Sequence, residues 1–213
     1  MGWLRPALVI ATLLGAAGVW MALLSHVDVL GDRIPAVALD AYRTASAAAP
    51  GVADGCEVDW RVLAAIGKVE SDHGRVGEER TLSRDGTIRP PIRGAALDGT
   101  AGRQAIHDTD GGVLDGDSLW DRAMGPLQFI PTTWSELGRD GNRDGHADPD
   151  NLYDAALTAV AHLCTREPGD YARRADLRRA LISYNASERY ANEVLGWVDR
   201  YAARTERELM APG

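Results

Sequence analysis

The chain has 213 residues, 45% of them hydrophobic and 25% charged, which is the balance of a folded globular protein and not of a disordered one. This length allows an N-terminal segment followed by one domain with a substantial core. The formal net charge is −8 at pH 7. Because no basic stripe offsets this charge, we expect no nucleic-acid partner.

Residues 1–30 are predicted to form an N-terminal membrane anchor with its linker. Arg5 precedes an uncharged run over residues 7–24 that is about long enough to span a bilayer. Positive charge before this run and Asp28 after it would leave the N-terminus in the cytoplasm and place the rest of the chain outside. The alternative is a signal peptide cleaved at the small residues 15–18, although the apolar run continues beyond them. In both cases the domain is exported.

The two cysteines, Cys56 and Cys164, agree with export. In an oxidising compartment such a pair is more often a disulfide than a metal or redox site. The bond would close a loop of about 108 residues. Two separate buried thiols are the alternative.

The elements predicted along the chain are helices. An amphipathic helix is expected over residues 35–48, and Asp59 can cap a second helix that runs to about His73, where Gly74 would end it. Further helical segments are predicted over 118–138, 152–164, 175–186 and 189–209. No strand pattern of any length appears, so we expect a mainly α domain over residues 31–205 and a tail over 206–213.

Residues 75–118 differ from the rest of the domain. They are rich in Gly, Asp, Pro and Arg and have no helical period. A loop of this length inside a compact domain is usually functional or mobile. We therefore interpret residues 75–118 as a long polar insertion.

Glu70 lies where a carboxylate is costly. At the helical period it shares a face with Leu63 and Ile66, and Gly67 lies beside them. Desolvation on this apolar face and the position in the last helical turn both raise a carboxyl pKa. A carboxylic acid that is still protonated near neutral pH is suited to general acid catalysis, as in glycosidases. The alternative is a Glu that pairs with an Arg and simply closes the helix.

Three segments in order resemble the lytic transglycosylases. They are Glu70-Ser71 in "VESDHG", Gly125-Pro126-Leu127-Gln128 in "RAMGPLQFIPTTW" and Tyr184-Asn185 in "LISYNASERY". They match the Glu-Ser, Gly-x-x-Gln and Tyr-Asn motifs of that family. The resemblance covers about residues 35–200 and is closer to the murein transglycosylase B-type branch of GC-rich Gram-positive bacteria. It implies a lysozyme-like SLT fold, mainly helical, with a cleft for the glycan strands of peptidoglycan and with no organic cofactor.

The resemblance also implies a reaction in which Glu70 is the only catalytic acid and base. Glu70 would protonate the oxygen between N-acetylmuramic acid and N-acetylglucosamine. It would then deprotonate the muramoyl C6 hydroxyl, which attacks C1 and gives a 1,6-anhydro product during cell-wall remodelling. A hydrolase usually needs a second carboxylate, and Asp72 points to another side of the helix. Since loop acids could approach in space, a hydrolytic muramidase stays open, as does a non-catalytic peptidoglycan-binding or scaffold protein.

Five further positions receive substrate-binding roles from the resemblance: Ser71, Gln128, Tyr184, Asn185 and Tyr190. Ser71 would orient the Glu70 carboxyl, with a helix-end cap as the alternative. Gln128 would hydrogen-bond to the sugar beside the acid. Asn185 would contact the N-acetyl region or position Glu70, and Tyr184 would pack or donate near Glu70. Tyr190 would line the cleft wall.

An acidic loop follows the Gln128 segment. Asp140, Asn142 and Asp144, followed by Gly145, reproduce the opening of an EF-hand loop, in which oxygen ligands at alternate positions converge on one Ca²⁺. At the place of the closing bidentate acid this chain has Asn151.

The B-type transglycosylases have a similarly lengthened loop, and this resemblance assigns Asp154 as the closing ligand and the backbone carbonyl of His146 as a further one. Asp148 or Asp150 could replace Asp154. A solvated Asp-Gly turn without calcium is the alternative to the whole site.

A second acidic stretch lies inside the insertion. Asp108, Asp110, Asp115 and Asp117 could hold another cation. A flexible loop beside the cleft is the favoured interpretation.

These expectations also name partners. The glycan strands of peptidoglycan would be the substrate, and the N-terminal helix would bind the membrane and hold the catalytic domain on its outer side. Proteins of cell-wall synthesis or division are further expected partners.

Overall fold

The structure is a computed structural model that describes residues 33–77 and 79–210. The chain divides into two units, Met1–Arg33 and Ile34–Gly213, and the fold described below is that of the second. The predicted membrane anchor within residues 1–30 lies outside the described residues. Among the residues that are described, no helix has both the length and the apolarity needed to cross a bilayer.

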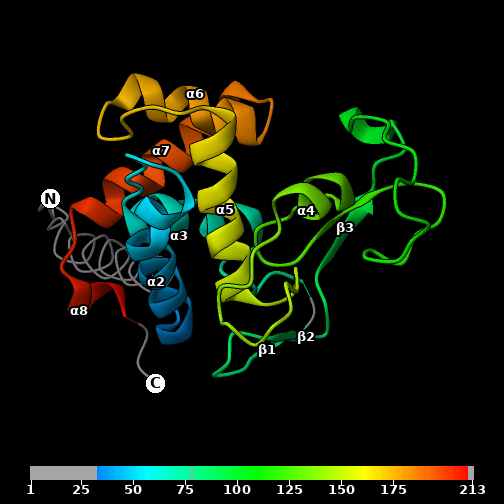
Figure 1. Cartoon of the computed structure of the whole chain (residues 1–213), viewed down its shortest axis with the longest axis horizontal. Helices are drawn as coiled ribbons and strands as arrows, with labels where there is room; N and C mark the ends of the chain where they lie inside the picture. The colour runs from blue at the N-terminus through cyan, green and yellow to red at the C-terminus, as the bar shows by residue number, and fades with distance from the viewer. Residues whose placement is uncertain (1–32, 78, 211–213) are drawn as a thin grey trace, which may run out of the picture. The chain divides into compact units, whose positions relative to one another are not determined.

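The second unit is mainly α-helical, as predicted (Figure 1). Its helices are α2 (Ala36–Val52), α3 (Trp60–Ser71), α4 (Pro131–Leu137), α5 (Leu152–Arg166), α6 (Arg174–Tyr184), α7 (Glu188–Ala202) and α8 (Glu206–Leu209). The segments between α3 and α4 form β1 (Thr81–Leu82), β2 (Ile88–Arg89), β3 (Arg93–Ala96), the 3-10 helix η1 (Thr100–Gly102) and β4 (Arg122–Met124). Strands β1 and β2 pair antiparallel, and so do β3 and β4.

The core lies between the long helices. Helix α2 packs against α5, and α3 packs against α7. Tyr42, Leu63, Ile66, Leu163 and Leu195 come from these four helices and are almost completely buried. Each such side chain contributes about 1.5–3 kcal/mol through burial, so this core is what holds α3 in place.

Cys56 and Cys164 form the predicted disulfide, with their Cα atoms 5.9 Å apart. Cys56 lies in the segment before α3, and Cys164 lies in the last turn of α5. The bond therefore ties the start of the α3 segment to the end of α5.

Helix α3 begins as predicted and ends slightly earlier. The Asp59 carboxylate accepts a hydrogen bond from the backbone N–H of Arg61 (2.8 Å), which caps the start of the helix. The helix ends at Ser71 and not at His73, because Asp72 and His73 adopt left-handed backbone conformations with φ of 51° and 59°. Glu70 is thus the penultimate residue of α3.

The segment over residues 118–138 was expected to be helical throughout, and this prediction was wrong. It holds strand β4, a turn and only the short helix α4. Gly125 and Gln128 have positive φ of 69° and 54°, and Pro126 lacks the N–H that a helix interior needs. The expectation of no strands was also wrong, since strands of two to four residues are too short to show an alternating pattern.

The last predicted helix is interrupted. Helix α7 ends at Ala202, and α8 starts at Glu206. Thr205 donates its hydroxyl to the Glu208 carboxylate and also donates its backbone N–H to it (2.8 and 2.7 Å), so this pair begins a new helix.

A buried hydrogen-bond chain joins α2, the end of α3 and α7. The hydroxyl of Tyr42 lies 3.0 Å from His73 Nδ1, and His73 Nε2 lies 3.2 Å from the hydroxyl of Tyr201. Burial lowers the pKa of His73 to about 3, so the ring is neutral. The chain therefore fixes the end of α3, beside Glu70, without a buried charge.

Gly67→Ala is expected to destabilise the protein. A Cβ at Gly67 would overlap the hydroxyl of Tyr42, which is completely buried, so Tyr42 would have to move away from His73. We expect a loss of about 1–3 kcal/mol in the free energy of unfolding, measured by urea denaturation. Gly196→Ala is the matched control, because a Cβ there meets nothing within 4 Å, and the change should add about 0.5–1 kcal/mol in helix α7. Equal effects at both positions would contradict the close contact with Tyr42.

Candidate active site

Glu70 is a desolvated carboxyl group near the end of α3. Burial raises its pKa to about 7, and the nearby Tyr190 hydroxyl opposes part of this rise. No charged side chain among the described residues contributes to the shift, and none forms an ion pair with Glu70. The alternative of an Arg-paired Glu that closes the helix therefore does not apply within the described residues.

Two tyrosines form the surroundings of Glu70. Tyr190, on α7, is 7% exposed, and its hydroxyl makes no well-aligned hydrogen bond although it lies close enough to affect the Glu70 pKa. Tyr184, at the end of α6, donates its hydroxyl to the carbonyl of Leu127 (3.0 Å). The two rings stack with centroids 6.3 Å apart. Burial, followed by the charge of Glu70, raises the pKa of both phenols well above 10, so both are neutral.

The Gly125–Gln128 turn is attached to the end of α3. Ser71 is 1% exposed, donates its hydroxyl to the carbonyl of Pro126 (2.7 Å) and accepts from the N–H of Gly74 (2.8 Å). Its one hydroxyl proton is used there, so Ser71 links the helix end to the turn and acts as the helix-end cap that was the alternative for it. A contact of Ser71 with substrate stays a prediction.

Gln128 faces a cavity. Its side-chain amide donates to the carbonyl of Gly125 (2.9 Å), which holds the side chain beside the turn. The cavity has a volume of about 680 Å³. Its lining includes Gln128, Phe129, His162, Tyr184 and Asn185, and Asn185 is exposed at the end of α6. Glu70 does not itself line the cavity, but Tyr184 lines it and lies near enough to Glu70 for the charge of Glu70 to act on its phenol.

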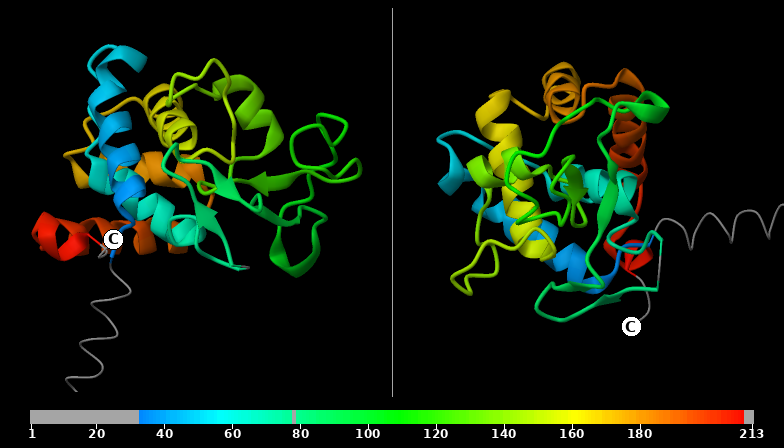
Figure 2. Two further views of the ribbon diagram at one scale, coloured as in Figure 1. Left: turned by 90° about the horizontal axis from the view of Figure 1, so that it is seen from below. Right: turned by 90° about the vertical axis from the view of Figure 1, so that its right-hand side faces the viewer.

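The insertion forms one wall of this cavity. Leu97, Arg103, Gln104 and Ile106 line it together with Gly102. Strands β3 and β4 hold this wall, and the loop between them projects from the helical part of the unit (Figure 2). The sequence did not indicate these residues, because only the pairing of β3 with β4 brings them to Gln128.

His162 was also missed. It lies on α5, is 8% exposed, and its ring meets that of Tyr184 edge to face with centroids 4.9 Å apart. Burial, and then the charge of Arg166, lowers the pKa of His162 to about 4, so it is neutral at the cavity. A histidine on an apolar helix face usually belongs to the core, so the pattern carried no signal for it.

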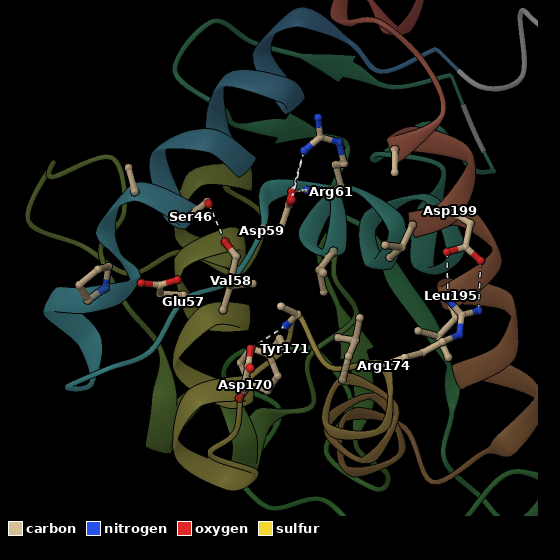
Figure 3. A pocket seen from close by; sticks show the side chains of 17 residues that line it. Ser46, Glu57, Val58, Asp59, Arg61, Asp170, Tyr171, Arg174, Leu195 and Asp199 are labelled. Atoms are coloured by element: carbon tan, nitrogen blue, oxygen red, sulfur yellow. Dashed lines mark hydrogen bonds and ion pairs between the residues drawn. The ribbon is translucent and has the colours of Figure 1, made fainter.

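A second cavity, of about 710 Å³, lies between α2, the start of α3, α6 and α7 (Figure 3). Its charged side chains are largely paired, with Asp59 on Arg61 (3.1 Å) and Arg174 on Asp199 (2.9 Å). Arg61 lies nine residues before Glu70, or about 14 Å along the helix. None of the predicted site residues lines this cavity, so it is separate from the candidate acid.

The predicted calcium ligands belong to one hydrogen-bonded loop. Asp140 accepts from the N–H groups of Asp144 and Gly145 (3.1 and 2.8 Å). Asn142 accepts from the N–H of Asp144 (3.0 Å), and Asp144 accepts from the N–H of His146 (2.9 Å). The loop thus turns around the three side chains in the order that the motif predicts.

Asp154 closes this loop from the first turn of α5. It is completely buried and accepts from the N–H groups of Gly141, Asn142 and Asp148 (2.8, 3.1 and 2.9 Å). Desolvation raises its pKa, and the charge of Asp140 adds to the rise. Asp150, the alternative ligand, pairs instead with the guanidinium of Arg93 (2.8 and 2.9 Å). The contacts therefore favour Asp154 over Asp150 as the closing acid.

The second acidic stretch contributes two residues to an acidic cluster. Among the described residues, Asp108, Asp110 and Asp121 bring carboxylate oxygens within 4.8 Å of one another. Asp115 and Asp117, which could have held a cation with the first two, are not part of this cluster and accept from the backbone N–H groups of Arg122 and Leu119. Asp121 lies outside the acidic stretch, and the bridge between His107 and Trp120 brings it near.

The molecule is thus a mainly helical protein in which a desolvated carboxyl group, Glu70, lies near the cavity that Gln128 and Tyr184 line. Residues 106–176 match the family model described as the transglycosylase SLT domain. No curated protein matches the chain. The matched segment includes Gln128, the acidic loop and α5, and it implies peptidoglycan transglycosylase activity and peptidoglycan binding in general terms. Glu70 and Tyr184 lie outside the matched residues.

Proposed function

We propose that this chain is a peptidoglycan lytic transglycosylase of the murein transglycosylase B type. The observation that carries the proposal is Glu70, whose burial raises the pKa to about 7 with no second carboxylate contributing to the shift. The SLT match over residues 106–176 supports the substrate class. The cavity lined by Gln128, Tyr184 and Asn185 supports a site of suitable size beside the acid.

In this proposal Glu70 acts first as an acid and then as a base. Near pH 7 about half of the Glu70 carboxyls are protonated, so the group can give a proton to the glycosidic oxygen between N-acetylmuramic acid and N-acetylglucosamine. The resulting carboxylate takes the proton of the muramoyl C6 hydroxyl, whose oxygen bonds to C1. The leaving sugar departs with the first proton, and the 1,6-anhydro ring forms without water.

The neighbouring groups have supporting roles. The Tyr190 hydroxyl, which lies near Glu70 and lowers its pKa, would donate to the carboxylate formed after the first step. Asn185 and Gln128, on the cavity wall, would hydrogen-bond to the N-acetyl and hydroxyl groups of the sugars. Tyr184 would pack beside the carboxyl at the cavity wall, where its ring lies among Phe129, His162 and Tyr190.

A muramidase is the second candidate function. The observation against it is that no second carboxyl among the described residues contributes to the pKa of Glu70. Hydrolysis usually uses a second carboxylate to activate water or to stabilise the sugar cation. The cavity lining contains no Asp or Glu. A non-catalytic peptidoglycan-binding or scaffold protein is the third candidate, and it would leave the cost of desolvating Glu70 without a function.

The products of the reaction test this proposal. The full chain is incubated with purified peptidoglycan, and the soluble fragments are analysed by mass spectrometry. We expect fragments that end in 1,6-anhydro-N-acetylmuramic acid. Fragments that end in reducing muramic acid would identify a muramidase, and the absence of any fragments would favour the non-catalytic candidate.

We propose further that the loop closed by Asp154 binds a structural Ca²⁺. Its side-chain donors are oxygens, which hard cations prefer, and Asp154 is a buried carboxylate without a basic partner among the described residues. Asp140, Asn142, Asp144 and Asp154 would hold the ion with the backbone carbonyl of His146. The ion would supply rigidity to the loop before α5, and it takes no part in the reaction.

Chelation tests the calcium proposal. EDTA should lower the melting temperature of the wild-type chain, because an ion that binds only the folded state stabilises it. Asp144→Ala should abolish the EDTA effect, measured by differential scanning calorimetry with and without added Ca²⁺. Asp110→Ala is the matched control, since it removes a carboxylate from the other acidic cluster. If the EDTA effect is lost in Asp110→Ala but kept in Asp144→Ala, the ion binds in the insertion. If EDTA does not change the melting temperature of the wild-type chain, the calcium proposal is wrong.

We also propose the location that the sequence predicts. Residues 1–30 would anchor the chain in the cell membrane, with residues 31–205 as the catalytic domain on the outer side. A disulfide supports an oxidising compartment for that domain. Proteins of cell-wall synthesis or division would meet the domain there.

A further inference from the structure

The charge of the Gln128 cavity differs from the charge of the whole protein. The chain has a formal net charge of −8. The residues that line the cavity include no Asp, Glu or Lys and one arginine, Arg103. His162, on the same lining, is neutral because burial lowers its pKa to about 4. The one permanent charge on the cavity wall is therefore positive.

Arg103 is held in place from behind. Its Nε donates to the carbonyl of Ala96 (3.0 Å), and its Nη2 donates to the Asp98 carboxylate (3.1 Å) and to the Thr100 hydroxyl. Ala96, Asp98 and Thr100 do not line the cavity. Among the described residues, Arg103 Nη1 has no hydrogen-bond partner. The hydrogen bonds of Nε and Nη2 thus fix the orientation of the guanidinium, and the two N–H groups of Nη1 can donate to a ligand.

The opposite wall of the cavity fits a sugar. Tyr184 and Asn185 come from the end of α6, and Gln128 comes from the turn that Ser71 attaches to α3. These neutral groups suit hydroxyl and N-acetyl groups. A ligand that bridges the two walls would place its sugar near Glu70 and extend an arm toward Arg103.

We propose that Arg103 binds a carboxylate carried on the lactyl arm of N-acetylmuramic acid. This inference rests on the proposed function, since it takes peptidoglycan as the ligand of the cavity. The carboxylate has two sources: the free lactyl group of strands without peptide, and the peptide attached to that group. In both cases a charge-assisted pair forms at a preformed guanidinium, and the insertion selects muramic acid over N-acetylglucosamine.

Binding is measured in a Glu70→Gln background, in which the strands stay intact. Three ligands are compared by isothermal titration calorimetry: chitin oligosaccharides, which lack a carboxylate, glycan strands without peptide, and glycan strands with peptide. Arg103→Gln should weaken binding of a carboxylate-bearing ligand about tenfold and leave the chitin oligosaccharides unchanged. A loss confined to strands without peptide assigns the lactyl carboxylate, and a loss confined to strands with peptide assigns a peptide carboxylate.

Asp98→Asn is the matched control. Asp98→Asn breaks the Arg103–Asp98 ion pair but keeps the positive charge of Arg103. If the pair had only a structural role, Asp98→Asn and Arg103→Gln would weaken binding equally. We expect Asp98→Asn to bind the carboxylate-bearing strands at least as tightly as the parent does. If Arg103→Gln does not fold, the ionic-strength dependence of the parent replaces it, because the preference over chitin should fall with added salt.

If Arg103→Gln weakens binding of all three ligands equally, or of none, the proposed role of Arg103 is overturned. The proposed function is then still decided separately, by the fragments that the wild-type chain releases from peptidoglycan. Absence of binding by all three ligands would overturn both.

Discussion

Glu70→Gln is expected to abolish the 1,6-anhydro products and to lower kcat by about 10²–10⁴-fold. An amide cannot give a proton to the glycosidic oxygen, and it cannot take one from the C6 hydroxyl. The substitution keeps the size of the side chain in its setting beside Tyr190, so the fold should be unchanged. Mass spectrometry of the released fragments and a melting curve check the two statements.

The pH dependence of the wild-type rate gives a sharper readout of the same residue. The reacting form of Glu70 is protonated, so kcat/KM should fall about tenfold per pH unit above a pKa of about 7.

The free energy of unfolding should also depend on the protonation of Glu70. Because the folded pKa is raised from 4.5, the folded state holds more protons than the unfolded state between about pH 4.5 and pH 7, and stability falls as the pH rises through this window. The loss is at most about 3 kcal/mol, since part of the side chain reaches solvent.

Glu57→Gln is the control for both measurements. Glu57 is an exposed carboxylate on the second cavity, away from the tyrosines. This variant should keep the products, the rate and the pH profile of the wild type. Full activity in Glu70→Gln would contradict the assignment of the acid, whichever products are formed.

Removal of the disulfide should cause the largest loss of stability. The Cys56–Cys164 bond closes a loop of 108 residues, and in the chain-entropy model such a cross-link contributes about 4–5 kcal/mol by restricting the unfolded chain. The double variant Cys56→Ala with Cys164→Ala keeps small apolar side chains at these buried positions. Its free energy of unfolding in urea should be lower than that of the oxidised wild type by about this amount.

A reductant provides the control for this effect. Dithiothreitol should lower the urea midpoint of the wild type to about that of the double variant and should leave the double variant unchanged. Identical midpoints of oxidised and reduced wild type would show that the bond contributes nothing to stability.

The parts of the fold that were predicted from sequence are those with a local signal. Periodic apolar residues and the Asp59 cap gave α2 and α3, and the two cysteines gave the disulfide. The same periodicity placed Glu70 on an apolar helix face, and burial raises its pKa as expected. These features depend on neighbours a few residues apart in the chain.

The parts that were missed depend on distant residues. Arg103 and His162 reach the cavity only through the β3–β4 pairing and the packing of α5 against α6. The resemblance assigned Ser71 to the Glu70 carboxyl, whereas its hydroxyl donates to the carbonyl of Pro126, which is 55 positions away. Asp121 joins Asp108 and Asp110 through a bridge that no local pattern shows. Sequence adjacency alone cannot distinguish such partners.

The disulfide also divides the candidate site into two parts. Glu70, the insertion and Gln128 lie inside the covalent ring that the bond closes, whereas Tyr184, Asn185 and Tyr190 lie after Cys164 and outside it. Opening of α6 and α7 therefore does not require the ring to open. Such an opening would bring water to Glu70, return its pKa toward that of a free carboxyl, and leave it an ordinary carboxylate at neutral pH. The acid strength of Glu70 thus depends on the packing of α7 against α3, a contact that the disulfide itself does not hold.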